Sequence, residues 1–175
     1  AHRDHVSGID ELRSFNFIQK KEIKAFGNRE LVNQLRKDYS YIFSDLKYPG
    51  LPDIELNTVE KNFYIENVKV IPIKVKHYKL NILGYRIKDL TYITDAKTIN
   101  KHELKKINGS KILVINCLQI KEHLSHLNLK EMLNLVSNID VGKVYLTHIS
   151  HNLGLHEEVN KKLPKNIELA YDNLE

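Results

Sequence analysis

The first residues of the chain, His2, Asp4 and His5, form the pattern H-x-D-H, in which two imidazoles and a carboxylate stand close together. Imidazole nitrogens and carboxylate oxygens are ligands of first-row divalent metals. Because the pattern stands at the very start of the chain, we expect part of the site, and part of the fold, to lie upstream of Ala1. The chemistry that these residue types offer is metal-assisted hydrolysis.

Three more candidate ligands follow, each at the end of a predicted strand. His77 ends the strand predicted from residue 68, Asp95 ends the strand at 91–94, and His148 ends the strand at 143–147. In layered α/β proteins the residues just past strand C-terminal ends gather at one edge, where ligands bind. Taken singly, a strand-end histidine is commonly a surface residue and Asp95 a helix cap. Their coincidence favours a metal site without thiolate ligands.

The helices and strands that position these residues are predicted from the periodicity of hydrophobic residues and from glycine and proline, which interrupt such elements. Helix and strand alternate after residue 100, which favours parallel strands with helices outside, while the earlier run of strands favours a meander. The combination predicts a layered α/β protein. Ser7 is a capping-type residue, and a helix is predicted to begin there. Strands are predicted at 23–26, 54–59, 68–75, 82–87, 91–94, 111–116, 143–147 and 167–171, and further helices at 29–39, 101–107, 129–137 and 155–163.

Composition limits the architecture and the partners. The 175 residues, 42% hydrophobic and 28% charged, contain no linker or repeat and predict a single domain over residues 1–175. No apolar stretch approaches the roughly 18 residues of a membrane-spanning helix, and no signal peptide is evident, so we expect a cytoplasmic protein. The net charge of +5 comes from scattered lysines and arginines, which argues against a nucleic-acid groove and suits a small anionic substrate. Cys117, the single cysteine, is predicted to be a buried small hydrophobe.

The order of these residues resembles the metallo-β-lactamase superfamily, whose ligand pattern is H-x-H-x-D-H followed by His, Asp and His at successive strand ends. Shorter runs are similar to the PhnP-like cyclic phosphodiesterase branch of that superfamily. These runs are Pro72-x-x-Val75-x-His77-x-Lys79-Leu80, Gly84-Tyr85, Thr94-Asp95, Ser125-His126-x-Asn128-Leu129 and Leu146-Thr147-His148-Ile149-Ser150-His151.

The resemblance implies an αββα sandwich that binds two divalent metal ions, Zn or Mn, with Fe also compatible. His2 and His77 would bind the first metal, together with a histidine one residue before Ala1. Asp4, His5 and His148 would bind the second, and Asp95 would bridge the two. Most N-terminal strands of the family fold would be absent from this chain.

The implied activity is hydrolysis of a small, cyclic phosphodiester by a hydroxide held between the two metals. Asp4 would also orient that hydroxide, and His126 would act as general acid for the leaving oxygen. The alternative for His126 is an idle residue at a helix entry. His151 and Asp172 would contact substrate or support a metal-ligating histidine, with local hydrogen bonding as the alternative for both.

Several other polar residues carry weaker expectations. Solvent exposure is expected for three histidines, His102, His123 and His156. Arg13, Lys79 and Arg86 are candidates for phosphate contacts, with a plain surface role as the alternative for each.

Three competing functions are also compatible with the sequence. A tRNA 3′-end endonuclease of the same superfamily ends in a similar Thr-His run, but it usually carries a Gly/Pro-rich arm, and nothing between His5 and His77 resembles one. Another metallo-β-lactamase-fold hydrolase is a further alternative. A metal-binding module with impaired catalysis is expected if the chain truly begins at Ala1, because one metal would then lack a ligand. The sequence is compatible with a homodimer.

Overall fold

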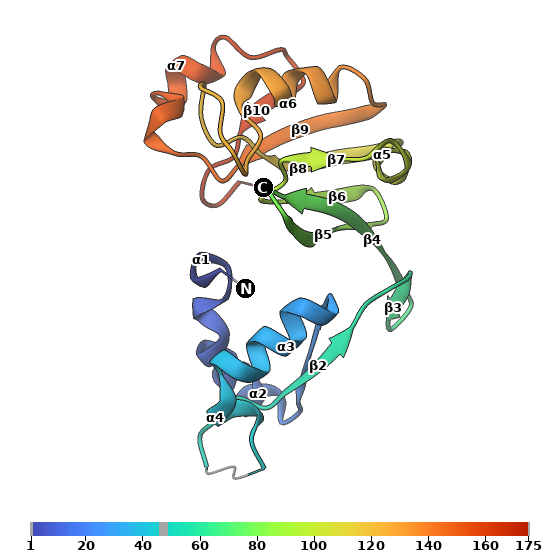
Figure 1. The fold of residues 1–175 in the computed structure, drawn as a ribbon, viewed down its shortest axis with the longest axis vertical. Helices are drawn as coiled ribbons and strands as arrows, with labels where there is room; N and C mark the ends of the chain where they lie inside the picture. The colour runs from blue at the N-terminus through green and yellow to red at the C-terminus, as the bar shows by residue number, and fades with distance from the viewer. Residues whose placement is uncertain (1, 46–48, 175) are drawn as a thin grey trace. The chain divides into compact units, whose positions relative to one another are not determined.

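The computed structural model describes residues 2–45 and 49–174, which fall into two compact units, residues 1–60 and 61–175 (Figure 1). Ala1, the position before His2 in the predicted motif, lies outside the described residues. The prediction of one domain over residues 1–175 stays a prediction. Within the described residues, no helix has both the length and the apolar character needed to cross a membrane.

The first unit combines short helices with a two-stranded parallel sheet. Asn28 begins the longest of these helices, because its side chain accepts a hydrogen bond from the Leu31 N–H at 2.8 Å and satisfies one of the unpaired first-turn donors. Asn16 joins a second helix to the sheet through both backbone groups of Asp53, at 2.8 and 3.0 Å. The elements are α1 (Arg3–Val6), η1 (Ser7–Glu11), α2 (Leu12–Gln19), β1 (Ile23–Gly27), α3 (Arg29–Asp38), α4 (Ser40–Phe43) and β2 (Ile54–Thr58).

The second unit is built on an eight-stranded mixed sheet with the order β10-β9-β8-β6-β5-β4-β3, to which β7 adds by pairing with β4. Strands β3 to β6 form a meander, and β6, β8, β9 and β10 run parallel. The elements are β3 (Phe63–Ile65), β4 (Val68–His77), β5 (Leu80–Ile87), β6 (Leu90–Ile93), β7 (Thr98–Ile99), α5 (Lys101–Ile107), β8 (Ser110–Asn116), α6 (Leu129–Val136), β9 (Val141–Thr147), η2 (His151–Leu153), α7 (His156–Asn160) and β10 (Ile167–Leu169).

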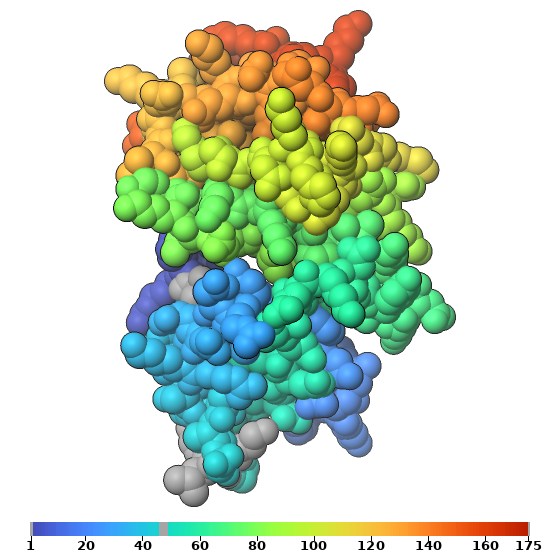
Figure 2. Space-filling view, turned by 45° about the vertical axis from the view of Figure 1, so that its right-hand side comes forward, coloured from blue at the N-terminus to red at the C-terminus, as the bar shows by residue number. Residues whose placement is uncertain are grey.

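The core of the second unit lies between the sheet and its helices. Ile107 of α5 and Met132 of α6 are fully buried against strand residues such as Ile115, and they belong to one continuous apolar cluster. The outer face of α5 is exposed and is seen in yellow in Figure 2. Cys117 belongs to the same cluster, and burial raises the pKa of its thiol to about 12. The prediction of a buried small hydrophobe at this position is confirmed.

Two polar devices fix the ends of the helices of the second unit. Asn128 and Glu131 form a reciprocal capping box at the start of α6, and Lys97 pairs with the same glutamate at 2.7 Å. The Arg86 guanidinium donates to the backbone oxygen of Lys106 in the last turn of α5, at 2.9 Å, and to that of Gly109 just after this helix, at 3.1 Å. Arg86 is thus engaged in the fold, and its predicted phosphate contact stays a prediction.

Candidate metal centre

The ends of three strands in the second unit bring His77, Asp95 and His148 to one edge of the sheet. Strand β4 is antiparallel to β5, which is antiparallel to β6, so β4 points the same way as the parallel set β6, β8 and β9. His77 is the last residue of β4, and the two other residues follow β6 and β9. The expected meeting of strand ends at one edge is therefore confirmed.

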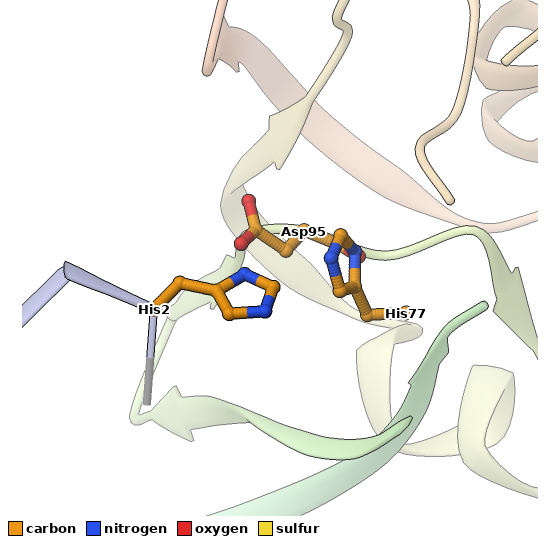
Figure 3. Close-up of side chains that lie close together, drawn as sticks. All are labelled: His2, His77 and Asp95. Carbon is orange, nitrogen blue, oxygen red and sulfur yellow. The ribbon is translucent and has the colours of Figure 1, made fainter. Parts of the chain in front are cut away.

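His77 is buried, and its ring lies beside Asp95 (Figure 3). Two backbone oxygens determine the orientation of this ring. Its Nδ1 lies 2.9 Å from the carbonyl oxygen of Asp95 and 3.0 Å from that of Ser125. A carbonyl oxygen only accepts, so Nδ1 must carry the ring proton. The lone pair is then on Nε2, the tautomer that a metal ligand requires.

Asp95 and His148 lie against each other in unusual backbone conformations. Their φ angles are +62° and +55°, in the left-handed region that residues other than glycine seldom adopt. Nε2 of His148 lies 3.0 Å from Oδ1 of Asp95. Non-glycine residues held in this region are frequent at functional sites, where the surrounding structure offsets the strain.

Asn116 holds the turn that carries Asp95. Its fully buried side chain accepts from the N–H of Ala96 at 2.7 Å and donates to the carbonyl oxygen of Ala96 at 3.0 Å. The N–H and the C=O of Ala96, the residue after Asp95, are thus both bound by one side chain at the end of β8. This side chain fixes the direction of the Asp95 loop, and sequence reasoning did not single it out.

His126, the predicted general acid, lies beside these residues in the loop before α6. Its ring stacks on that of His148, with centroids 4.9 Å apart and an interplanar angle of 17°, and meets the edge of His77 at 4.6 Å. Its Nε2 lies 3.7 Å from Oδ1 of Asp95. Burial is the main cause that lowers the pKa of His126 to about 4; the Asp95 carboxylate raises this pKa, and the neighbouring histidines lower it. The structure therefore places His126 in the cluster, with a ring that is neutral at neutral pH in the metal-free protein.

His123 is the residue of the cluster that the sequence did not reveal. It was expected to be solvent-exposed, but it is half-buried, and its ring lies 4.9 Å from that of His126. His102, with its side chain 80% exposed, and the exposed His156 do agree with that expectation. The only signal in the sequence was that His123 stands three residues before His126. In a loop, unlike in a helix, this spacing does not indicate that two side chains lie on the same face.

The other predicted site residues belong to the start of the first unit and to the end of the second unit. His2 precedes α1, and Asp4 and His5 lie within it, where Nε2 of His5 is 3.4 Å from Oδ2 of Asp4. This pair therefore belongs to a short helix, and the helix that was expected to begin at Ser7 continues from it as η1. His151 begins η2 and Asp172 lies after β10, both exposed. Their predicted roles, and the six predicted metal ligands, stay predictions.

Two further candidates for phosphate contacts are on the surface. Arg13 lies in α2, and the ammonium of Lys79 lies 5.2 Å from the centre of the Tyr78 ring in the turn after β4. Neither is engaged in a way that decides between phosphate binding and a plain surface role.

Comparison with known proteins decides the family. The model of a family described as a beta-lactamase superfamily domain matches residues 1–149. The chain belongs to the beta-lactamase superfamily. The family and the α/β fold class predicted from the sequence are thereby confirmed.

Several solved structures are similar to the chain in fold. The crystal structure of a diphosphatase from the PhnP family is 30% identical, with a TM-score of 0.89 over 99% of this chain and 67% of that one. The metallo-β-lactamase-fold protein YhfI from Bacillus subtilis is 17% identical, with a TM-score of 0.74 over 97% of this chain and 71% of that one. The short form of human tRNase Z is 16% identical, with a TM-score of 0.66 over 99% of this chain and 74% of that one. The last two comparisons support the superfamily fold alone.

One curated relative carries a different description. An octanoyltransferase of Porphyromonas gingivalis is 32% identical over 177 residues, which cover 99% of this chain and 36% of that protein. The chain therefore spans about a third of the length of this relative.

For a member of the beta-lactamase superfamily, the second unit offers a donor set that suits a first-row divalent metal. Asp95 and His148 each present one ligand atom, and these atoms lie within 4.8 Å of each other. The ring of His77 adds an Nε2 lone pair, because its Nδ1 proton is held by two carbonyls. Imidazoles and a carboxylate without thiolate fit zinc, manganese or iron. These residues fit the metal that the sequence predicts.

Proposed function

We propose that the chain is a metal-dependent hydrolase that acts on a small phosphodiester. The observation that carries this proposal is the arrangement of His77, Asp95 and His148 at one sheet edge, with the His77 tautomer set for metal binding. The similarity to a diphosphatase of the PhnP family, at 30% identity, supports phosphoester chemistry. His2, Asp4 and His5 enter the proposal as ligands through their sequence motif and the family match that includes them.

Bound divalent cations would supply positive charge that polarises the phosphoryl oxygens and favours attack by hydroxide. The protein residues have separate tasks. A backbone hydrogen bond orients the ring of His77, and constrained turns carry Asp95 and His148, so the residues that would hold the metals lie close together before any metal binds. Asp4 is proposed to ligate and to orient the attacking oxygen.

His126 is proposed to protonate the leaving oxygen. A ring with a pKa of about 4 is neutral at neutral pH, so proton donation depends on the bound substrate, whose negative charge favours the protonated ring. His151 and Asp172 are proposed to contact substrate or to support a ligating histidine.

We do not propose an acyl transfer activity like that of the octanoyltransferase for this chain. A covalent acyl transfer through cysteine would need an accessible thiolate. Cys117 is the single cysteine of the sequence, it is fully buried, and the pKa of its thiol is raised to about 12.

Turnover of bis(p-nitrophenyl) phosphate tests the proposal. The purified chain is stripped with a chelator, reloaded with Mn²⁺ or Zn²⁺, and assayed for metal content and nitrophenol release. We expect bound metal and turnover, and we expect Asp95→Ala to lower kcat by about 100-fold or more, because it removes the predicted bridging carboxylate. Asp140→Ala, at an exposed position, is the matched control and should leave turnover unchanged. Absence of both bound metal and turnover in the wild-type chain would favour the module without catalysis.

A further inference from the structure

Three polar residues of the loop between β8 and α6, His123, Ser125 and His126, lie side by side. Nδ1 of His126 is 3.1 Å from Nδ1 of His123 and 3.0 Å from Oγ of Ser125. Two imidazole nitrogens at 3.1 Å cannot both present lone pairs to each other, so a proton lies between them. The contact between the two rings is therefore a hydrogen bond that has a direction.

The backbone of Ser125 determines this direction. Its N–H donates to Nδ1 of His123, with the nitrogens 3.3 Å apart. Because a backbone N–H only donates, Nδ1 of His123 is an acceptor, and the proton of that ring is on Nε2. The proton between the rings therefore belongs to His126, and its Nδ1–H is shared between Nδ1 of His123 and Oγ of Ser125.

We propose that His123 is a positioning residue, which accepts the Nδ1–H of His126 and thereby directs the Nε2 of His126 towards Asp95 and His148. This inference rests on the proposed function. The other side of the His126 ring agrees with it, because Nε2 lies 3.7 Å from Oδ1 of Asp95 while the ring stacks on His148. A loop residue, His123, thus binds the ring at Nδ1, and Nε2 is the nitrogen that can donate a proton to the leaving oxygen.

The role of the hydrogen bond follows from the proton balance of the reaction. As hydroxide adds to phosphorus and the phosphorus–oxygen bond to the leaving group breaks, the His126 imidazolium passes its Nε2 proton to the leaving oxygen. The ring that remains is neutral and carries its proton on Nδ1, the form that His123 stabilises as an acceptor. An orienting acceptor behind a catalytic imidazole is a recurrent way to fix its tautomer.

Two substitutions of His123 separate positioning from simple packing. In His123→Asn the side-chain oxygen can occupy nearly the same place as Nδ1 and accept the same proton, whereas His123→Ala removes the acceptor. His102→Ala, which changes a histidine with an 80% exposed side chain, is the control. The metal-loaded variants are assayed on two diesters that differ in the leaving group, one releasing p-nitrophenol and the other the less acidic phenol.

We expect His123→Ala to lower kcat for the phenyl diester by about 10- to 100-fold, because that leaving group needs a proton, and to change kcat for the nitrophenyl diester much less. His123→Asn should restore most of the loss. Independently of turnover, long-range ¹H–¹⁵N spectra of the metal-free protein should show His126 protonated at Nδ1, with the resonance assigned by its loss in His126→Gln.

An equal loss with both diesters, failure of asparagine to rescue, or a His126 ring protonated at Nε2 would overturn the role of His123 while leaving the proposed function intact. Absence of turnover in the wild-type chain would instead overturn the proposed function and with it the catalytic part of the inference. In that case the spectrum alone decides whether the hydrogen bond exists.

Discussion

The buried ring of His126 should make the stability of the metal-free protein depend on pH. Burial lowers the pKa of His126 to about 4, from the ordinary value of 6.5 that the unfolded chain restores. Between these values the unfolded chain binds a proton that the folded chain rejects, so stability rises with pH. The contribution is fully present above about pH 6.5 and is lost as the pH falls towards about 4.

The magnitude follows from the same two values. Integrating the linkage from neutral pH to about pH 5 gives about 2 kcal/mol for an isolated group with this change of pKa. The ring retains contact with solvent, its side chain being 12% exposed, and screening reduces the expected effect to about 1 kcal/mol. Other groups also titrate in this range, so the measurement has to compare variants rather than two pH values alone.

Urea unfolding of the chelator-treated protein, followed by circular dichroism at about pH 7.5 and about pH 5, measures this effect. His126→Gln has no proton to gain, so wild type should lose about 1 kcal/mol more than this variant between the two pH values. His102→Gln, at the exposed histidine, should behave like wild type. Equal losses in wild type and His126→Gln would show that the ring is not protonated on unfolding and would refute the reasoning.

Two further predictions concern the second unit. Asn116→Ala should lower the free energy of unfolding by about 2 kcal/mol, because the buried N–H of Ala96 loses its acceptor and the C=O of Ala96 loses one of its two donors. The same substitution should also weaken metal binding, measured by titration. Asn134→Ala, on the exposed face of α6, is the control and should change the stability and the metal affinity little. Unchanged metal affinity in Asn116→Ala would show that Asn116 does not position Asp95. Cys117 should react with a thiol reagent in the native chain at least about 10-fold more slowly than in urea, because the thiol is buried and burial raises its pKa to about 12. Rapid labelling of the native chain would contradict the position of Cys117 in the core.

The sequence was sufficient to predict the strand ends and the residues they deliver. Periodicity located β4, β6 and β9, and the topology then required His77, Asp95 and His148 to share an edge. It could not locate β3 and β7, because strands of three and two residues are stabilised by pairing with β4 rather than by their own pattern.

The parts of the site that escaped prediction depend on the path of the chain in space. Asn116 and His123 act through contacts to Ala96 and His126 that no local pattern encodes. The tautomer of His77 likewise depends on two carbonyls, one of them 48 positions away in the sequence. Hydrogen-bond partners of this kind depend on the three-dimensional path of the loops, which the sequence pattern does not indicate.

The carbonyl contact from Asp95 to His77 makes two properties of the cluster separable by mutation. The oxygen that holds Nδ1 of His77 belongs to the backbone, so it survives any side-chain replacement at position 95 that preserves the turn. The carboxylate can therefore be deleted while the neighbouring imidazole keeps its proton on the same nitrogen. Metal affinity lost on such a deletion can then be attributed to one ligand, with the orientation of the next held constant.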